Sequence, residues 1–300
     1  MRASTRTAVG LLAALALLTA ACSSNSSSSV AVTTTAPPDR GPVDVLYAGS
    51  LTTAMENDIG PAFTKATGYR FSGYGAGSTA LASAITGKVR QGDVFISASP
   101  AVNATLEGAA NGSWVSWYAA FATAPLVLGY NPTSSFAADL KTTPWYQVVT
   151  RPGFLLGRTD PVLDPKGKLT ATAITDTVTS TGDSALLKLL QGTAGVFPEE
   201  TLVGRLQAGQ LDAGFFYANE AKAAGIPNVP LGTVSLSATF TVTVLAGAPH
   251  EAGAEAFVAY LLGTADGKAE LGAEGLALVT PPTVSGTGVP ASLTPVLGTS

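Results

Sequence analysis

The sequence predicts an α/β fold with two lobes, mostly parallel sheets, flanking helices and a cleft between the lobes. From Val43 onward a strand, a small-residue turn and a helix follow one another repeatedly, which is typical of a parallel α/β sheet. Two later apolar strands are expected to pass from one lobe to the other. The composition, 46% hydrophobic and 12% charged with 33 Gly and 19 Pro, indicates a well-buried fold with many turns.

The first part of the body contains three such units. Strands are predicted at 43–47, 69–74 and 93–97. The first helix has Leu51, Met55 and Ile59 on one face, and Pro61 is expected to kink or divide it. The second helix has an apolar stripe of Leu81, Ile85 and Val89, and Pro100 suits the first turn of a third helix.

The rest of the body continues the pattern and contains the two crossings, predicted at 124–130 and 240–245. Two lobes follow, the first formed by 42–127 with 243–300 and the second by 128–242. The other predicted elements are a strand at 153–157, helices near Leu186 and Leu202, a strand-to-helix unit at 213–223, and helices at 254–262 and 269–276.

The N-terminus has the features of a bacterial export signal. Residues 1–21 combine a basic start, a short apolar run and small residues before Cys22, which is the only cysteine. This pattern is similar to a lipobox and predicts a lipid on Cys22, although Thr19 stands where Leu is usual. Residues 22–41, rich in Ser, Thr and Pro, are expected to be a flexible tether. Plain secretion with a chance cysteine is the alternative.

Charge and residue counts exclude several classes of function. Removing Arg2 and Arg6 with the signal leaves 14 basic against 20 acidic residues, which argues against a nucleic-acid partner. With His250 as the only histidine, a His/Cys metal site is excluded and a Ser-His-Asp triad is disfavoured. No phosphate-binding loop, no cofactor and no later membrane-spanning segment are predicted.

Hydroxyl side chains stand at the predicted strand-to-helix turns. Gly49 and Ser50 follow the first strand, Ser78 and Thr79 follow the second, and Tyr217 ends the strand of the 213–223 unit. A hydroxyl beside free N–H groups at a helix N-terminus suits an anion. Each serine alone could be a helix cap, and Tyr217 a core or surface residue. Their recurrence at one end of the sheet favours an anion site.

From Val43 to about Thr283 the chain resembles the type II periplasmic binding proteins for molybdate and tungstate. Two stretches are similar to that family's oxyanion loops, one resembles its most recognisable strand, and one resembles the segment with the ligand tyrosine. They are, in order, 47–55, 77–82, 92–99 and 214–221. The resemblance implies Ser50, Ser78 and Tyr217 as ligand residues, with Gly49 and Thr79 beside them.

The family implies two ways of holding the anion. In one group the tetrahedral oxyanion receives only hydrogen bonds, and in the other two carboxylates raise the metal to six-coordination. Asp164 falls on the aspartate of the second group, but Phe216 occupies its glutamate position, and Glu220 is the nearby acid that could substitute. We therefore expect tetrahedral binding, with Asp164 as a cap or loop residue and the Lys166 and Gly167 amides facing the ligand.

The resemblance further implies a monomeric binding protein, not an enzyme, anchored outside the cytoplasm through Cys22 and delivering oxyanion to the permease and ATPase of an ABC importer. Sequence does not rank molybdate against tungstate. One alternative is another anion: sulfate, phosphate or an organic acid. An organic acid would favour an arginine clamp, from Arg90, Arg151, Arg158 or Arg205. A further alternative is an α/β enzyme using Asp160 and Asp164, or Glu199 and Glu200, as acid and base. Glu199 and Glu200 follow Pro198 and more simply suit a helix start, where acids favour the helix dipole.

Overall fold

The computed structural model describes residues 38–298, so the predicted signal peptide, Cys22 and most of the tether lie outside the described residues. Among the residues described, no helix is both long and apolar enough to cross a membrane. The strands are β1 (Pro42–Ala48), β2 (Arg70–Ala76), β3 (Val94–Ser97), β4 (Trp117–Tyr130), β5 (Leu156–Gly157), β6 (Ala213–Tyr217), β7 (Asn228–Pro230), β8 (Ser237–Val244) and β9 (Ala277–Gly286).

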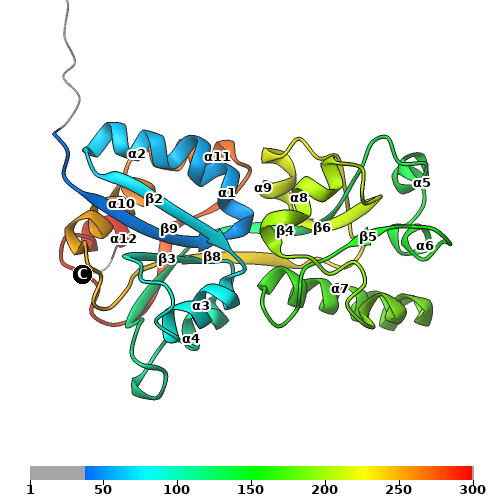
Figure 1. Ribbon diagram of the computed structural model, residues 1–300, viewed down its shortest axis with the longest axis horizontal. Helices are drawn as coiled ribbons and strands as arrows, with labels where there is room; N and C mark the ends of the chain where they lie inside the picture. The colour runs from blue at the N-terminus through cyan, green and yellow to red at the C-terminus, as the bar shows by residue number, and fades with distance from the viewer. Residues whose placement is uncertain (1–37, 299–300) are drawn as a thin grey trace, which may run out of the picture. The chain divides into compact units, whose positions relative to one another are not determined.

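Helices flank the strands throughout, as an α/β fold requires (Figure 1). The α-helices are α1 (Thr52–Ala54), α2 (Gly60–Thr67), α3 (Ser78–Thr86), α4 (Pro100–Ala104), α5 (Ala137–Thr142), α6 (Trp145–Val149), α7 (Pro165–Thr181), α8 (Glu199–Gln207), α9 (Ala218–Ala223), α10 (Glu251–Gly263), α11 (Ala265–Ala273) and α12 (Thr294–Leu297). Shorter helical turns are η1 (Gly49–Leu51), η2 (Met55–Ile59), η3 (Ala109–Asn111) and η4 (Ser184–Leu190).

The sheet has the order β2-β1-β3-β8-β4-β6-β5, with β7 and β9 also paired to β4. Parallel pairing joins β1 to β2, β1 to β3 and β5 to β6. The pairings of β4 and β8 are antiparallel. The α/β class is confirmed, but the sheet is mixed rather than mostly parallel, because the two long central strands run opposite to their neighbours.

Strand β4 belongs to two groups of strands. Up to Pro125 it pairs with β8 and β9, and from Leu126 onward with β6, β7 and the end of the 231–237 loop. In Figure 1, β1, β2 and β3 lie on one side of this change of partner and β5 and β6 on the other. One strand thereby joins two bodies of sheet, and β8 runs back beside it.

The first helix forms as predicted, and it changes from π-helical to α-helical hydrogen bonding next to Pro61 rather than dividing there. Leu51, Met55 and Ile59 are fully buried. The π-helical turn η2 precedes α2, in which Pro61 occupies the first turn, where its missing N–H costs least. In the second helix Leu81 and Ile85 are buried, but Val89 is 84% exposed because α3 ends at Thr86, so the predicted stripe is one residue too long.

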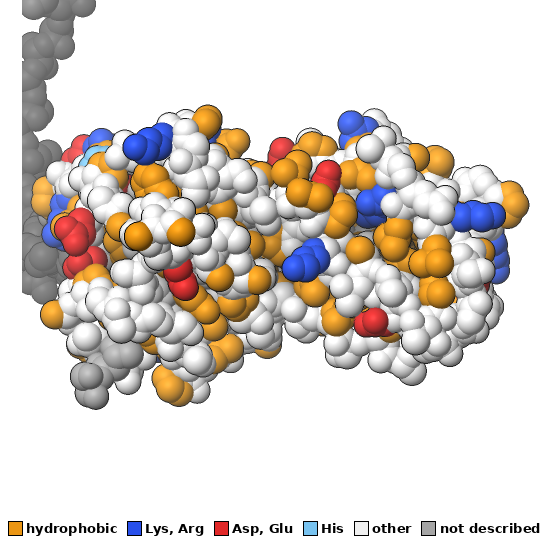
Figure 2. Space-filling view, turned by 90° about the horizontal axis from the view of Figure 1, so that it is seen from below, with side chains coloured by type: hydrophobic (Ala, Val, Ile, Leu, Met, Phe, Trp, Pro, Cys, Tyr) orange, Lys and Arg blue, Asp and Glu red, His pale blue; other side chains and the backbone are white. Residues whose placement is uncertain are grey.

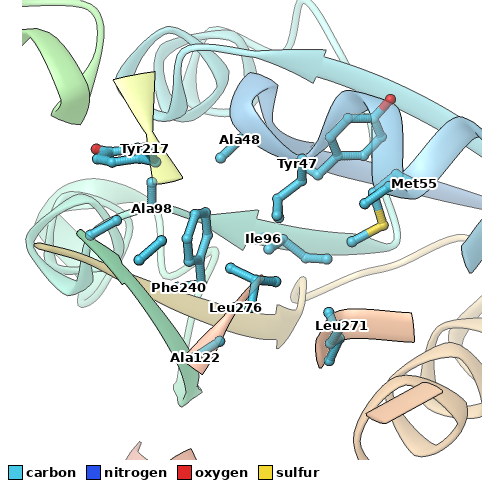
Figure 3. Close-up of a cluster of buried hydrophobic side chains, with 14 of the residues drawn as sticks. Tyr47, Ala48, Met55, Ile96, Ala98, Ala122, Tyr217, Phe240, Leu271 and Leu276 are labelled. Carbon is cyan, nitrogen blue, oxygen red and sulfur yellow. The ribbon is translucent and has the colours of Figure 1, made fainter. Parts of the chain in front are cut away.

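A single hydrophobic cluster continues across the change of partner in β4. It includes Phe121 and Phe240 from the crossing strands and Phe215 and Tyr217 from β6. Figure 3 shows Tyr217 beside Phe240, whose ring lies 6.0 Å away in an edge-to-face arrangement. Tyr217 is therefore held by the core on one side, and its position relative to β1 and β3 is fixed by packing.

Candidate functional site

Three strand ends meet around Tyr217. Strand β1 ends at Ala48 and leads into Gly49 and Ser50, and Ala98 follows β3; Figure 3 shows Ala48 and Ala98 near Tyr217. The Asn219 side chain, two residues beyond Tyr217, donates to the carbonyl of Ser50 at 3.1 Å. The backbone N–H of Ala98 donates to Oγ of Ser78 at 3.1 Å. The structure thus brings together the three hydroxyl residues that the sequence singled out.

Two of these hydroxyls are buried without a hydrogen-bond partner among the described residues. Ser50 is 5% exposed and Tyr217 is fully buried, and neither Oγ nor the phenol oxygen is paired. Burial, and then the nearby carboxylates of Asp164, Glu199 and Glu220, raise the pKa of Tyr217 well above its usual value. The phenol therefore stays protonated and can donate to an anion.

The third hydroxyl, Ser78, is also fully buried and begins α3. Since its Oγ accepts from Ala98, its own proton is still available to a ligand. Thr79, the next residue, is only partly buried, so the structure gives it a more peripheral position.

Gly49 lies against Glu199, which the sequence suggested as a helix-start acid or, in the enzyme alternative, as an acid–base residue. A Cβ at Gly49 would stand 2.8 Å from Oε2 of Glu199, so only glycine allows this approach. Glu199 begins α8 and is 3% exposed. Its carboxyl group therefore faces the turn that carries Ser50.

Glu199 belongs to a buried group of charges that we call the cleft cluster: Asp164, Lys166, Glu199 and Glu220. Nζ of the fully buried Lys166 bonds both oxygens of Glu220, at 2.9 and 2.7 Å. Oε1 of Glu199 lies 3.3 Å from the same Nζ as an ion pair, without hydrogen-bond geometry. The ring centroid of Tyr217 is 5.8 Å from this Nζ, so the cluster borders the hydroxyl site.

Burial controls the pKa values in the cleft cluster. It raises the pKa of Glu199 well above the usual value, reinforced by Asp164 and opposed by Lys166. Burial also raises the pKa of Asp164 and of Glu220, again against Lys166. Burial alone would lower the pKa of Lys166, but Glu220 and Glu199 reverse this and raise it. Lys166 is thus the fixed cation of the cluster, and burial makes its carboxyl groups harder to ionise than exposed ones.

Asp164 has two functions in the geometry. Its Oδ1 accepts from the N–H of Lys166 at 3.0 Å and caps α7, as the cap interpretation expected. Its Oδ2 is buried and unpaired within the described part of the chain. The cap uses the Lys166 amide that was expected to face the ligand, and Gly167 packs against the backbone of Thr159 and Asp160.

The position of Phe216 explains why no carboxylate comes from β6. Side chains alternate along a strand, so Phe216 points away from Tyr217 into a separate cluster with Leu202, Leu206 and Ile226. Glu220, the acid considered as its substitute, is held by Lys166. A second buried carboxyl group beside Gly49 and Ser50 comes from Glu199, which the sequence interpretation assigned to a helix start or to the enzyme alternative and not to the anion site.

The two bodies of sheet contact each other at the site. The N–H of Ala80 in α3 donates to the carbonyl of Leu163 at 3.1 Å, and a Cβ at Gly77 would lie 2.7 Å from that oxygen. A cavity of about 380 Å³ opens beside these contacts and is lined by residues of both bodies, including Gly77, Asp164 and Glu199. The two carboxyl groups therefore line this cavity, and Glu199 also contacts the turn that carries Ser50.

The arginines considered for an organic-acid clamp are engaged elsewhere. Arg158 donates to the carbonyls of Leu189 and Gly192, and Arg151 pairs with Asp139. The other two stack on rings, Arg90 on Tyr74 and Arg205 on Phe197. Figure 2 shows Lys and Arg scattered rather than gathered on the face that it displays. No described arginine thus takes the position that a carboxylate ligand would favour.

The acids of the enzyme alternative also have structural partners. Oδ1 of Asp160 accepts from the N–H of Val162 at 2.7 Å, within the loop that precedes α7. Asp164 caps α7. His250 precedes α10, and its ring Nδ1 lies 3.0 Å from Oδ2 of the fully buried Asp93.

A fold with these two bodies of sheet and a polar site between them is that of a solute-binding protein. Residues 43–276 match the model of the bacterial extracellular solute-binding protein family, and the chain belongs to that family. A binding protein, rather than an enzyme, is thereby confirmed, and an extracytoplasmic location agrees with the family.

Among curated relatives, a Haloferax volcanii protein named as a candidate molybdenum-binding protein of an ABC transporter is 31% identical over 223 residues. The match covers 73% of this chain and 66% of that protein, just under two thirds of its length. An uncharacterized solute-binding protein of Halobacterium salinarum is 29% identical over 253 residues, covering 75% of this chain and 81% of that protein.

Solved structures share the fold at low identity. The periplasmic molybdate-binding protein of Azotobacter vinelandii has a TM-score of 0.62 at 20% identity, covering 79% of this chain and 99% of its own. The sulfate-binding protein SubI of Mycobacterium tuberculosis has a TM-score of 0.59 at 18% identity, covering 80% and 88%. The two-lobed α/β prediction is confirmed, and the fold alone does not separate molybdate from sulfate.

Proposed function

We propose that this protein captures a tetrahedral oxyanion, molybdate or tungstate, by hydrogen bonds from Ser50, Ser78 and Tyr217. The observation that carries the proposal is the pair of buried, unpaired hydroxyls of Ser50 and Tyr217, which come from the two bodies of sheet. A buried hydroxyl without a partner costs free energy that a bound anion would recover. Gly49 and Thr79 are the proposed neighbours at the same turns.

The N-terminus of α3 supplies the second part of the anion site. This helix has nine residues and begins at Ser78, beside the unpaired hydroxyls. Its dipole favours a negative charge at this end. Because the cleft cluster contains three carboxyl groups and one lysine, the attraction must come from such local dipoles and hydroxyl protons rather than from a basic surface.

Molybdate or tungstate is favoured over other anions by the relative named for molybdenum and by the sequence motifs of the oxyanion loops. Sulfate is the second candidate, because a sulfate-binding protein shares the fold. The engaged arginines argue against an organic acid. Asp164 is proposed as the helix cap that borders the ligand.

The proposed route of delivery is an ABC importer, with its permease and ATPase as partners. We propose that residues 42–127 with 243–300 form the first lobe and residues 128–242 the second, and that β4 and β8 act as the hinge between them. The chain is proposed to act as a monomer, anchored to the outer face of the cell membrane by lipid on Cys22 after removal of residues 1–21.

A thermal-shift panel tests the ligand. The purified protein is heated with molybdate, tungstate, sulfate, phosphate or buffer alone. A ligand at a thousand times its dissociation constant stabilises the folded state by about 4 kcal/mol. We expect molybdate and tungstate to give the largest shifts. A larger shift with sulfate would assign the site to the second candidate, and no shift with any oxyanion would refute the proposal.

A further inference from the structure

The charge of Glu199 has no function in the site as proposed so far. The lysine that could neutralise it is already bonded to both oxygens of Glu220, at 2.9 and 2.7 Å. Glu199 keeps only an ion-pair contact of 3.3 Å with that lysine, and neither of its oxygens has a hydrogen-bond partner in the described part of the chain. A carboxyl group that is 3% exposed and unpaired calls for an explanation, and a bound ligand is one.

The position of the carboxyl group identifies that partner. Oε2 of Glu199 packs directly on Gly49, the residue before the unpaired hydroxyl of Ser50. Glu199 also lines the cavity between the two bodies of sheet, together with Asp164, whose Oδ2 is likewise buried and unpaired. An oxyanion held by Ser50 and Tyr217 would therefore meet the Glu199 carboxyl group at close range.

An ionised Glu199 would repel such an anion. The charged and titratable groups that face it are Lys166 and Asp164 from α7, Glu220 from α9 and Tyr217 from β6. Glu200 of its own helix is exposed, and Tyr74 of β2, which lines the same cavity, carries Arg90 stacked on its ring. Within residues 38–298, Lys166 is the only cation in contact with Glu199, and Glu220 already uses it, so a dianion needs Glu199 to be neutral.

We propose that Glu199 is a ligand-contacting residue that donates a hydrogen bond to the oxyanion as a neutral carboxylic acid, so that binding takes up one proton from solvent at every pH at which Glu199 of the free protein is ionised. The O–H bond forms on Glu199 as the lobes close, and the proton returns to solvent on release. An ionised Glu199 would repel the oxyanion, whereas a neutral Glu199 donates a hydrogen bond to it, as the serine and tyrosine hydroxyls do. The raised pKa of Glu199 in its buried position agrees with this.

This inference rests on the proposed function, and calorimetry separates the two. Titration with molybdate, or with tungstate, in buffers of different ionisation enthalpy, repeated from about pH 6 to about pH 9.5, counts the protons taken up. We expect a proton uptake that rises toward one per oxyanion as the pH passes through the range in which free Glu199 ionises, and an affinity that falls about tenfold for each pH unit above that range. If no oxyanion binds, the proposed function itself is wrong. Binding with no proton uptake at any pH of the series, or with proton release, would overturn only the role of Glu199.

The variant Glu199→Gln provides the second measurement, with Glu200→Gln as the matched control from the same helical turn. A glutamine amide donates without a proton, so the variant should bind without proton uptake and with an affinity that no longer depends on pH. At the alkaline end of the pH series, where wild-type Glu199 is ionised, it should bind at least tenfold more tightly than wild type. Glu200→Gln should keep the wild-type proton count. A Glu199→Gln protein that keeps the wild-type pH dependence would contradict the proposal, and the wild-type proton count tests it even if the variant fails to fold.

Discussion

Two buried groups of ionisable side chains in this protein contrast in how their polar atoms are paired. Around Asp93, Oδ1 accepts from the N–H of His250 at 2.7 Å and Oδ2 from the N–H of Asp44 at 2.7 Å, with the His250 ring at 3.0 Å. In the cleft cluster, by contrast, both oxygens of Glu199 and one of Asp164 are unpaired among the described residues.

The difference indicates what each group does. Asp93 uses both oxygens to fasten β1 and the start of α10 to its own segment, so its bonds stabilise the fold. Asp44, Asp93 and His250 lie close enough to hold a metal ion, but the backbone bonds already occupy the buried carboxylate. The cleft cluster holds its fold through one lysine and leaves the remaining oxygens to a ligand. The presence or absence of hydrogen-bond partners thus distinguishes the structural charges around Asp93 from the proposed functional charges of the cleft cluster.

The largest expected effect comes from removing the cation of the cleft cluster. In Lys166→Met, three buried carboxyl groups lose their counter-charge, and breaking a buried ion pair costs about 3–5 kcal/mol. The free energy of unfolding, measured by urea denaturation, should fall by that amount. Lys168→Met, an exposed lysine on the same helix, should change it little. Adding Glu220→Gln to Lys166→Met should recover part of the loss, and no recovery would argue against the ion pair.

A smaller loss of stability is expected at the paired cluster, without loss of binding. Asp93→Ala leaves two backbone N–H groups unpaired, and the free energy of unfolding should fall by roughly 2–4 kcal/mol. The oxyanion affinity measured by calorimetry well below the melting temperature should match wild type. A change in oxyanion affinity as large as that expected for a variant of the binding site would contradict a purely structural function of the cluster around Asp93.

The opposite result is expected for a hydroxyl of the site. Tyr217→Phe removes one donor to the anion and should weaken oxyanion binding about 10- to 150-fold, the range for a hydrogen bond to a charged group. Stability without ligand should be unchanged or higher, since the lost hydroxyl has no partner. Tyr146→Phe, from α6 in the same lobe, serves as the control and should bind as wild type.

The subtlest effect is the pH dependence of stability without ligand. A carboxyl group whose folded-state pKa is raised stabilises the protein at low pH and loses that contribution as pH rises through the folded value. The raised pKa values of Glu199 and Asp164 therefore predict a stability that declines as pH increases above the usual glutamate range. Melting temperatures of Glu199→Gln should decline less steeply over the same range. A wild-type stability that rises with pH would contradict the assignment.

Most of the helices and strands could be predicted from the sequence, because apolar periodicity and turn residues mark elements that bury one face. Leu51, Met55 and Ile59 are buried as their spacing predicts. The mixed sheet could not be predicted in this way, because strand direction depends on which distant strand is paired. Strand β9 was missed, since its Pro281 and Pro282 are residues that usually interrupt strands.

The site was predicted in part. Ser50, Ser78 and Tyr217 were found because hydroxyls at helix starts have a local signature. Glu199 and Lys166 were missed as a pair, because they are 33 positions apart and meet only through the packing of α7 and α8. A glutamate after proline looks like an ordinary helix start, and only its burial distinguishes it.

The register between β4 and β6 has a consequence for how this site could be lost. Tyr217 is paired with Leu126, the first residue of β4 beyond the proline at the change of partner. A slip of one residue in β6 would turn every side chain of that strand to the opposite face and bring Phe216 to the place of Tyr217. The sheet would keep its backbone hydrogen bonds, yet the anion would meet a benzene ring. The chemistry of the cleft is therefore encoded in strand alignment as much as in the residues themselves, and an insertion or deletion in β6 is a more complete way to silence the site than any single substitution.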